Sequence, residues 1–166
     1  MHTQHPKTRI LFICHGNICR SPMAEFMMKN RVADAGRSDE FEIASAATST
    51  EELGSNLYPP ARETLRRHGV PFDRHVARQT TAADFARYDY IYLMDRNNLR
   101  NLRRLWPESV VQSEAFGRKV RLLMELCGTA RDVADPWYTG DFECTYRDID
   151  QALTAWFDTE TASNYP

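Results

Sequence analysis

Residues that can carry out covalent chemistry stand close together near the start of the chain, in the stretch FICHGNICRSP at residues 12–22. Cys14 and Arg20 form a C-x5-R pattern, with Gly16 and Cys19 between them. A thiolate acts as a nucleophile or a metal ligand, and a guanidinium binds phosphate through two parallel hydrogen bonds. Three interpretations follow: a zinc site, a structural turn with a buried cysteine, or an anion-binding loop with a nucleophile at its centre.

The zinc interpretation fails on the number of ligands. Cys14 and Cys19 stand in a C-x4-C pattern, at the upper limit of the usual spacing for a zinc pair. Cys127 and Cys144 form no second pair, and no pair of histidines supplies the missing ligands, so we expect no metal. The G-x-G-x-x-G and Gly-Lys-Ser/Thr fingerprints of nucleotide-binding loops are also absent. The turn interpretation stays open for Cys14 alone, because cysteine is often simply a small core residue.

The anion-binding interpretation accounts for more of these residues at once. A loop that leads into a helix presents unpaired backbone N–H groups to one point, where they can surround the oxygens of a phosphate. Gly16 would let the backbone approach such a ligand closely. The amides, the helix dipole and the guanidinium all favour a thiolate at Cys14, placed for in-line attack on phosphorus. The expected phosphate-binding residues are His15, Gly16, Asn17, Ile18, Cys19 and Arg20.

A nucleophile alone does not cleave a phosphate ester efficiently, because the leaving oxygen must be protonated. The segment ADPWYTGDFE offers Asp135 as a general acid, followed by Trp137 and Tyr138. An Asp-Pro pair is by itself usually a turn, and the two aromatic residues are open to a second interpretation as core residues that lead into the last helix.

The residues around the loop predict the elements that hold it. Residues 9–14, RILFIC, are a short continuous apolar run typical of a strand buried on both faces. Ser21 and Pro22 predict a helix cap followed by a proline at the first helical position. Helical spacing then recurs at Ala24, Met27, Met28, Val32 and Ala35, and Gly36 is placed to end the helix.

The remaining chain predicts further strands that alternate with helices. Strands are expected at residues 41–47, 88–94 and 119–124, although the last segment also allows a helix. Helices are expected from Pro59 to Gly69, after a Thr81–Asp84 capping box, and after Asp95 through Leu99, Leu102, Leu105 and Trp106. The most regular helical spacing joins Phe142, Tyr146, Ile149, Leu153, Trp156 and Phe157. We therefore expect a three-layer α/β/α fold of the flavodoxin-like or Rossmann-like type, with a central four-stranded parallel sheet and the loop at the C-terminal end of its first strand.

The length and composition of the chain limit the classes of protein to which it can belong. A chain of 166 residues without a repeat, linker or low-complexity tract is expected to form one domain, residues 1–166. The net charge of −2 indicates no general affinity for nucleic acid or an anionic membrane. The apolar run that ends at Cys14 is too short for a signal peptide or a membrane span, so we expect a soluble cytoplasmic protein with reduced cysteines.

The stretch CHGNICRSP resembles the signature of the low-molecular-weight protein tyrosine phosphatases. The order strand, C-x-G-N-I-C-R-S-P, helix is specific, whereas C-x5-R alone is weak. The DPWY segment at Asp135 is similar to the D-P-[YW]-Y segment of the family, and SAATS at 45–49, HVARQ at 75–79 and DYIYLMDRNNL at 89–99 also look like family segments. The resemblance implies a phosphotyrosine phosphatase that needs no cofactor, with Cys14 as nucleophile and Asp135 as the acid and then the base.

Supporting roles follow from the same resemblance. It implies that Asn17 and Ser21 hold the shape of the loop and stabilise the thiolate, and that Ser45 and His75 orient Asn17. Cys19 matches the second cysteine of the family, which can form a disulfide with the nucleophile on oxidation. Without the resemblance, His75 would be interpreted as a surface or capping residue, and Cys19 as a small buried residue.

Two positions bear on substrate preference. Many relatives place a bulky aromatic residue shortly after the segment that matches SAATS, where this chain has Glu51. A carboxylate at the mouth of the cleft would repel acidic phosphopeptides and favour basic flanking residues. Relatives that act on phosphoarginine tend to carry threonine where this chain has Ile18, so Ile18 favours phosphotyrosine. Trp137 and Tyr138 are expected to line the cleft and stack on an aryl substrate.

Alternative functions on the same scaffold need other residues. An arsenate reductase needs further cysteines close together, whereas Cys127 and Cys144 are isolated. A phosphoarginine phosphatase, a phosphocysteine carrier and a non-catalytic phosphotyrosine-binding module are further alternatives, and a carrier or a binding module has no use for Asp135. The expected partners are a phosphotyrosine protein and inorganic phosphate or similar oxyanions, with no nucleic acid and no membrane. We expect a monomer, with a weak dimer as the alternative.

Overall fold

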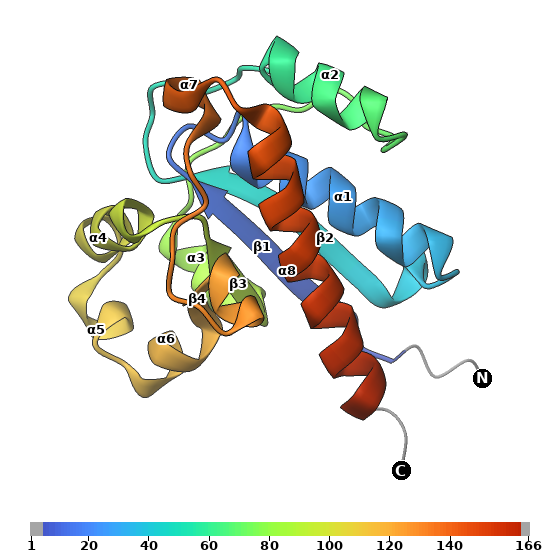
Figure 1. Cartoon of the computed structure of the whole chain (residues 1–166). Helices are drawn as coiled ribbons and strands as arrows, with labels where there is room; N and C mark the ends of the chain where they lie inside the picture. The colour runs from blue at the N-terminus through green and yellow to red at the C-terminus, as the bar shows by residue number, and fades with distance from the viewer. Residues whose placement is uncertain (1–4, 164–166) are drawn as a thin grey trace.

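Four parallel strands form the sheet at the centre of the molecule, in the order β2-β1-β3-β4 (Figure 1). The structure is a computed structural model and describes residues 5–163. The strands are β1 (Thr8–Cys14), β2 (Phe41–Ala47), β3 (Tyr90–Leu93) and β4 (Val120–Leu122). The predicted α/β fold is confirmed, although β3 and β4 are shorter than the apolar runs that predicted them.

Helices cover both faces of the sheet and give the expected three layers (Figure 1). One face carries α1 (Arg20–Asp34), α2 (Pro59–Arg67) and α8 (Phe142–Ser163). The other carries α3 (Ala82–Arg87), α4 (Arg96–Leu105), α5 (Glu108–Val111) and α6 (Glu114–Lys119). The short helices η1 (Ser38–Glu40), η2 (Leu123–Cys127) and α7 (Pro136–Thr139) lie in the connections. None of the helices within residues 5–163 is both long and apolar enough to cross a membrane.

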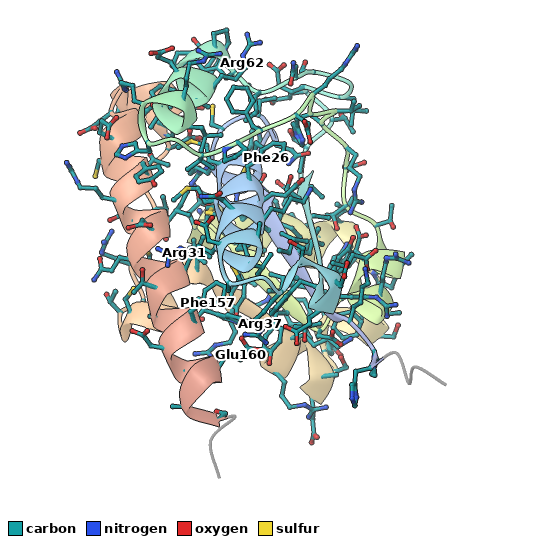
Figure 2. All side chains as sticks on the ribbon, turned by 90° about the vertical axis from the view of Figure 1, so that its right-hand side faces the viewer. Phe26, Arg31, Arg37, Arg62, Phe157 and Glu160 are labelled. Atoms are coloured by element: carbon teal, nitrogen blue, oxygen red, sulfur yellow. The ribbon has the colours of Figure 1, made fainter. Side chains whose placement is uncertain are left out.

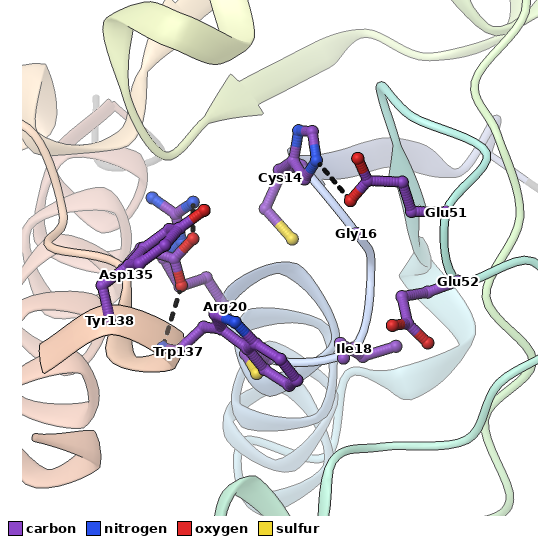
Figure 3. A pocket seen from close by; sticks show the side chains of 11 residues that line it. Cys14, Gly16, Ile18, Arg20, Glu51, Glu52, Asp135, Trp137 and Tyr138 are labelled. Atoms are coloured by element: carbon purple, nitrogen blue, oxygen red, sulfur yellow. Dashed lines mark hydrogen bonds and ion pairs between the residues drawn. The ribbon is translucent and has the colours of Figure 1, made fainter. Parts of the chain in front are cut away.

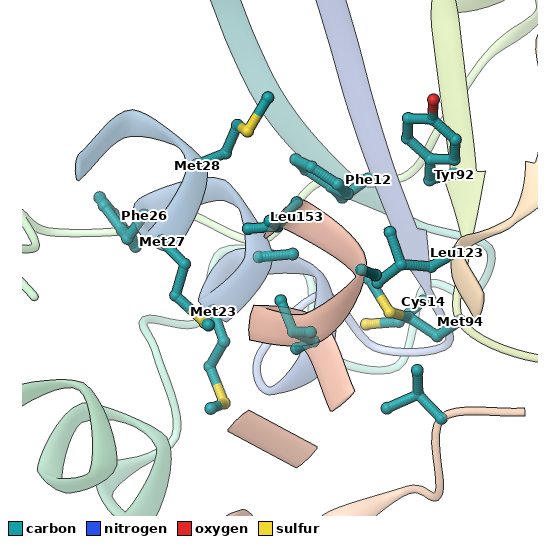
Figure 4. Packing of buried hydrophobic residues seen from close by; sticks show 14 of the residues in the cluster. Phe12, Cys14, Met23, Phe26, Met27, Met28, Tyr92, Met94, Leu123 and Leu153 are labelled. Atoms are coloured by element: carbon teal, nitrogen blue, oxygen red, sulfur yellow. The ribbon is translucent and has the colours of Figure 1, made fainter. Parts of the chain in front are cut away.

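Strand β1 explains why its sequence is apolar without a break. Phe12 and Cys14 belong to the core cluster under α1 and α8, whereas Leu11 and Ile13 belong to the cluster under α3, α4 and α6. Successive side chains of a strand point to opposite faces, so a strand covered on both faces has no polar side. Figure 4 shows Phe12 beside Leu153 and the methionines of α1.

Helix α1 begins earlier than Ser21 and Pro22 predicted. Its first residue is Arg20, and Cys19 occupies the cap position without a side-chain hydrogen bond. The predicted serine cap is therefore wrong. Pro22 fits the first turn because N–H groups there have no partner within the helix. Ser21 lies inside the helix, and its hydroxyl is used at the active site instead.

The other helix predictions agree with the structure at most positions. The Thr81–Asp84 capping box begins α3, and the side chain of Asp95 caps α4 through the backbone N–H of Asn98 at 2.7 Å. The spacing in the last segment is that of α8. Two residues expected on apolar helix faces are exposed, because Ala35 follows the end of α1 and Leu105 lies in the last turn of α4.

Ion pairs fix α8 against α1 at the edge of the core (Figure 2). The guanidinium of Arg31 donates to the side chains of Asp150 and Thr154 on α8. Arg37, just after α1, pairs with Glu160 at 3.3 Å. These contacts join the C-terminal end of α1 to α8.

Candidate active site

The loop between β1 and α1 wraps around the sulfur of Cys14. Cys14 is the last residue of β1 and is only 3% exposed. The backbone N–H of Asn17 donates to its Sγ at 3.3 Å, and the Oγ of Ser21 lies 3.0 Å from the same atom. Asn17 adopts a φ of 58°, and it is the only non-glycine residue with positive φ in the described part of the chain. The tight turn therefore falls on Asn17, whereas a turn role had been considered for Gly16.

The side chain of Asn17 sets the direction of the hydrogen bonds behind the sulfur. Its Oδ1 accepts from the backbone N–H of Arg78 at 3.2 Å, so its Nδ2 faces Ser21 and Ser45, at 2.8 and 2.9 Å. An amide nitrogen only donates, so both hydroxyl oxygens accept from it. The hydroxyl hydrogen of Ser21 is then free to point to Cys14, since its other acceptor, the carbonyl oxygen of Ala46, is 3.4 Å away.

His75 supports the loop from the same side. Its Nε2 lies 2.7 Å from the carbonyl oxygen of Asn17, so this nitrogen carries the hydrogen and donates. Burial lowers the pKa of His75, which favours the neutral ring. Ser45 donates onward to Glu25 at 2.7 Å, and Glu25 is paired with Lys29. Glu25 is a buried member of this network that the sequence analysis did not identify.

Arg20 is a buried cation between two carboxylates. Its side chain is 2% exposed and donates to Asp95 at 2.7 Å, to the carbonyl oxygen of Val133 at 2.8 Å and to Asp135 at 3.2 Å. Burial by itself would lower the pKa of Arg20, but the charges of Cys14, Asp135 and Asp95 outweigh it and raise the pKa. The guanidinium therefore stays charged and is held rigidly at the end of the loop.

Asp135 connects the loop to α7. Its Oδ1 accepts from the backbone N–H of Trp137 at 3.1 Å, which makes it the N-cap of α7, and its Oδ2 accepts from Arg20. Its side chain keeps 25% exposure, so one edge of the carboxyl group faces the cleft. The turn suggested by the Asp-Pro pair is thus real, and the same residue lies beside the candidate nucleophile.

Residues of the cysteine loop and of the α7 segment line one pocket of about 130 Å³ (Figure 3). Trp137 and Tyr138 stand at its rim, 53% and 84% exposed, so they are not core residues. Trp137 is supported from below by the ring of Tyr58, with centroids 4.9 Å apart. The pocket is lined by Cys14, His15, Gly16, Ile18, Cys19, Arg20, Glu51, Glu52, Asp135, Trp137 and Tyr138.

Two carboxylates lie across the mouth from the aromatic residues (Figure 3). Glu51 pairs with the ring of His15 at 3.0 Å and is 70% exposed. Glu52, which the sequence analysis did not identify, also lines the pocket. A Cβ on Gly16 would lie 3.5 Å from Cγ of Glu52, an ordinary contact, so the protein alone does not require glycine there.

Cys19 lines the same pocket as Cys14, and both thiols are free. Burial raises the pKa of Cys19 far above its usual value, and the nearby Cys14 raises it further. Cys19 therefore stays protonated and does not compete as a nucleophile.

The structure brings every predicted site residue to one region. Some of these residues line the pocket, and the others support the loop from behind. Asn17, Ser21, Ser45 and His75 lie behind the loop and outside the pocket lining, although Asn17 had also been expected among the phosphate-binding residues. Asp95 was expected only as a helix cap, and its DRNNL context carried no signal for its second bond, to Arg20.

Comparisons with known proteins agree with this geometry. A sequence model of the family described as "Low molecular weight phosphotyrosine protein phosphatase" matches residues 9–164. The human protein of that description is 40% identical over 141 residues, which cover 83% of this chain and 86% of the human protein. The crystal structure of YfkJ from Bacillus subtilis has a TM-score of 0.86 and 30% identity, and covers 98% of this chain and 99% of its own. Vibrio vulnificus Wzb in complex with benzylphosphonate has a TM-score of 0.77 and 28% identity, over 92% and 99%.

Proposed function

The chain belongs to the low molecular weight phosphotyrosine protein phosphatase family and is a hydrolase with protein-tyrosine phosphatase activity, and we propose that it works through a phosphocysteine on Cys14. This proposal rests on the position of the Cys14 sulfur at the floor of the pocket. The sulfur is within hydrogen-bonding distance of the N–H of Asn17 and of the hydroxyl of Ser21. Both groups are donors that stabilise a thiolate.

The first chemical step transfers the phosphoryl group to sulfur. The Cys14 thiolate attacks phosphorus, the bond to the aryl oxygen breaks, and Asp135 gives its proton to the leaving phenolate. Arg20 and the loop amides hold the phosphoryl oxygens, where charge is greatest in the transition state. The products of this step are the free phenol and S-phosphocysteine, with Asp135 ionised.

The second step returns the enzyme to its starting state. Ionised Asp135 takes a proton from a water molecule, which attacks phosphorus and releases Cys14 as thiolate with inorganic phosphate as the product. The bond between Arg20 and Asp135, 3.2 Å long, places the acid beside the group that would bind the phosphoryl oxygens. The hydroxyl of Ser21 stabilises the departing thiolate.

The shape and lining of the pocket support an aryl phosphate as the substrate. Buried Cys14 and Arg20 form its floor, and Trp137 and Tyr138 offer exposed aromatic faces at its rim. Benzylphosphonate, the ligand in the Wzb complex, combines an oxyanion with an aromatic ring in the same way. Ile18 lines the pocket where relatives that act on phosphoarginine tend to carry threonine. Phosphotyrosine fits these features.

Glu51 and Glu52 give one side of the mouth a negative character. We propose that this side disfavours acidic residues of a substrate and accepts basic ones. We further propose that the protein acts in the reducing cytoplasm, because the Cys14 thiol must stay reduced for turnover. The family match over residues 9–164 supports a single catalytic domain.

A comparison of substrates tests the proposed function. Phosphotyrosine, phosphoserine and phosphoarginine peptides of one sequence are assayed with the wild type and with Cys14→Ser. We expect hydrolysis of the phosphotyrosine peptide above the other two, and no turnover by Cys14→Ser, which should still bind inorganic phosphate. Full activity of Cys14→Ser would contradict the mechanism, and faster hydrolysis of phosphoarginine would contradict the substrate class.

A further inference from the structure

A row of unpaired arginines lies on helix α4, which begins at the active site. Arg100, Arg103 and Arg104 are exposed, and none of them makes a hydrogen bond or an ion pair within residues 5–163. Some exposed arginines elsewhere have partners, as Arg131 has in Asp148 at 2.7 Å, whereas Arg74 and Arg147 make no side-chain hydrogen bond or ion pair within residues 5–163 either. Arg100 and Arg104 are four residues apart in a helix, where like charges repel each other. A negatively charged partner would relieve this repulsion.

A second cleft, of about 440 Å³, joins the active site to this helix. It shares Arg20 and Asp135 with the active-site pocket, whereas Glu51 and Glu52 line only the pocket. The cleft shares His15, Arg20, Asp135 and Tyr138 with the pocket and is lined further by asparagines of α4. Its lining residues are His15, Arg20, Asp95, Asn97, Asn98, Asn101, Asp132, Val133, Ala134, Asp135 and Tyr138.

Helical periodicity places two of the arginines beside this cleft. Residues three and four positions apart share a helix face, so Arg100 lies next to Asn97 and Arg104 lies next to Asn101. Arg103 is rotated by about 100° from Arg104, away from the side that lines the cleft. Arg100 and Arg104 thus stand next to residues that line the cleft, although they do not line it themselves, and Arg103 is three residues from Arg100 and neighbours it on the helix surface.

We propose that the face of α4 with Arg100 and Arg104 docks an acidic segment of the phosphoprotein substrate, next to the phosphotyrosine. This inference rests on the proposed function. Arg100 and Arg104 lie about 8 and 14 Å along the helix from Asp95, at ~1.5 Å per residue. An extended peptide advances ~3.3 Å per residue, so the acidic side chains belong roughly two to four residues from the phosphotyrosine. A patch of two arginines on a chain of net charge −2 suits such a short segment better than a polyanion.

The test compares kcat/KM for phosphotyrosine peptides that carry glutamate or alanine at these positions, either before or after the phosphotyrosine. An exposed ion pair strengthens binding roughly 1.5- to 5-fold. We therefore expect the kcat/KM of the wild type at low salt to be about 3- to 10-fold higher for the glutamate peptide than for the alanine peptide, with the glutamates on one side of the phosphotyrosine only. Added salt should reduce this preference. The double variant Arg100→Glu/Arg104→Glu should lose or invert it, and Arg100→Lys/Arg104→Lys should keep most of it.

Control variants separate docking from catalysis. Arg147→Glu on α8 replaces an exposed arginine away from α4 and should keep the preference, and all variants should hydrolyse a small aryl phosphate like the wild type. Equal kcat/KM for acidic and neutral peptides, or a preference that survives Arg100→Glu/Arg104→Glu, would overturn the docking proposal. Inhibition by phosphatidylserine vesicles or by duplex DNA that depends on these arginines, without any peptide preference, would overturn it as well. Failure of the wild type to hydrolyse the small aryl phosphate would instead contradict the proposed function.

Discussion

The hydroxyl oxygen of Ser21 lies 3.0 Å from the sulfur of Cys14 and 2.8 Å from the Nδ2 of Asn17. Because Nδ2 can only donate, the hydroxyl accepts from Asn17 and is left to donate to the sulfur. The loop therefore presents Cys14 with a side-chain donor whose direction is fixed by residues outside the pocket. The arrangement stabilises negative charge on sulfur both before attack and when the phosphocysteine is hydrolysed.

Replacement of Ser21 by alanine removes this donor. A hydrogen bond to a charged group contributes about 1.5–3 kcal/mol, so kcat for a phosphotyrosine peptide should fall roughly 10- to 100-fold in Ser21→Ala. Steady-state kinetics measure the effect, and the exposed Ser38 provides a Ser38→Ala control. Wild-type kcat in a folded Ser21→Ala protein would show that the hydroxyl does not act on the sulfur.

Replacement of Asp135 by alanine tests the general acid. A positioned acid contributes typically about 10²- to 10⁴-fold, and its contribution grows as the leaving group becomes more basic. We expect Asp135→Ala to slow hydrolysis of phosphotyrosine far more than hydrolysis of p-nitrophenyl phosphate. Asp73→Ala, which removes an exposed carboxylate outside the pocket, should slow neither. The comparison uses kcat/KM, which reports the first step alone, and an equal loss of kcat/KM on both substrates would reject Asp135 as the acid.

Cys19 should protect the nucleophile from irreversible oxidation. Peroxide converts the Cys14 thiolate to a sulfenic acid, which can condense with the Cys19 thiol to a disulfide and release water. Wild-type activity lost to hydrogen peroxide should therefore return with dithiothreitol, whereas Cys19→Ser should recover much less. Cys144→Ser serves as the control. Equal recovery of wild type and Cys19→Ser would exclude this role.

Asp84 supports the site indirectly and gives a pH-dependent contribution to stability. Burial alone would raise the pKa of Asp84, but hydrogen bonds from Arg78, Thr81 and Thr80 outweigh it and hold the pKa below its usual 3.8. The unfolded state then binds the proton first as the pH falls. The contribution is therefore complete above the unfolded pKa and is lost as the pH falls through the lower, folded pKa.

The variant Asp84→Asn should make this contribution visible in urea unfolding curves. At about pH 7 the free energy of unfolding should fall by roughly 1.5–3 kcal/mol, because charged hydrogen bonds to Arg78 are lost. The difference from wild type should shrink below about pH 4, where Asp84 itself becomes protonated. A difference that does not change with pH would contradict the lowered pKa. Asp73→Asn is the matched exposed control.

The sequence predicted best those features of fold and function that depend on residues adjacent to one another along the chain. The buried strand β1, the loop with Cys14 and Arg20, and the start of a helix follow one another directly, so spacing alone indicated an anion site. The role of Asp135 came instead from the resemblance of its DPWY segment, and its neighbours Trp137 and Tyr138 lie at the rim of the same pocket. These segments meet because parallel strands bring their C-terminal ends to one edge of the sheet.

The sequence did not predict contacts between segments that lie far apart along the chain. No local pattern connected Arg20 to Asp95 or to Asp135, and the structure shows that it binds both. Ser21 has the residue type of a helix cap, but the helix begins at Arg20 and the hydroxyl of Ser21 contacts Asn17 and Cys14 instead. Short helices such as α5 carry too few residues for a periodic pattern.

The central claim is that a covalent phosphocysteine forms on Cys14, and rapid quenching followed by peptide mass spectrometry tests it most directly. The reaction of Asp135→Ala with p-nitrophenyl phosphate is stopped in acid, because loss of the base should slow hydrolysis of the intermediate more than its formation from an activated ester. We predict one added phosphoryl group on the peptide that contains Cys14, and none on that peptide from Cys14→Ser. Turnover by the wild type without any phosphorylated Cys14, or a phosphoryl group on another residue, would contradict the account.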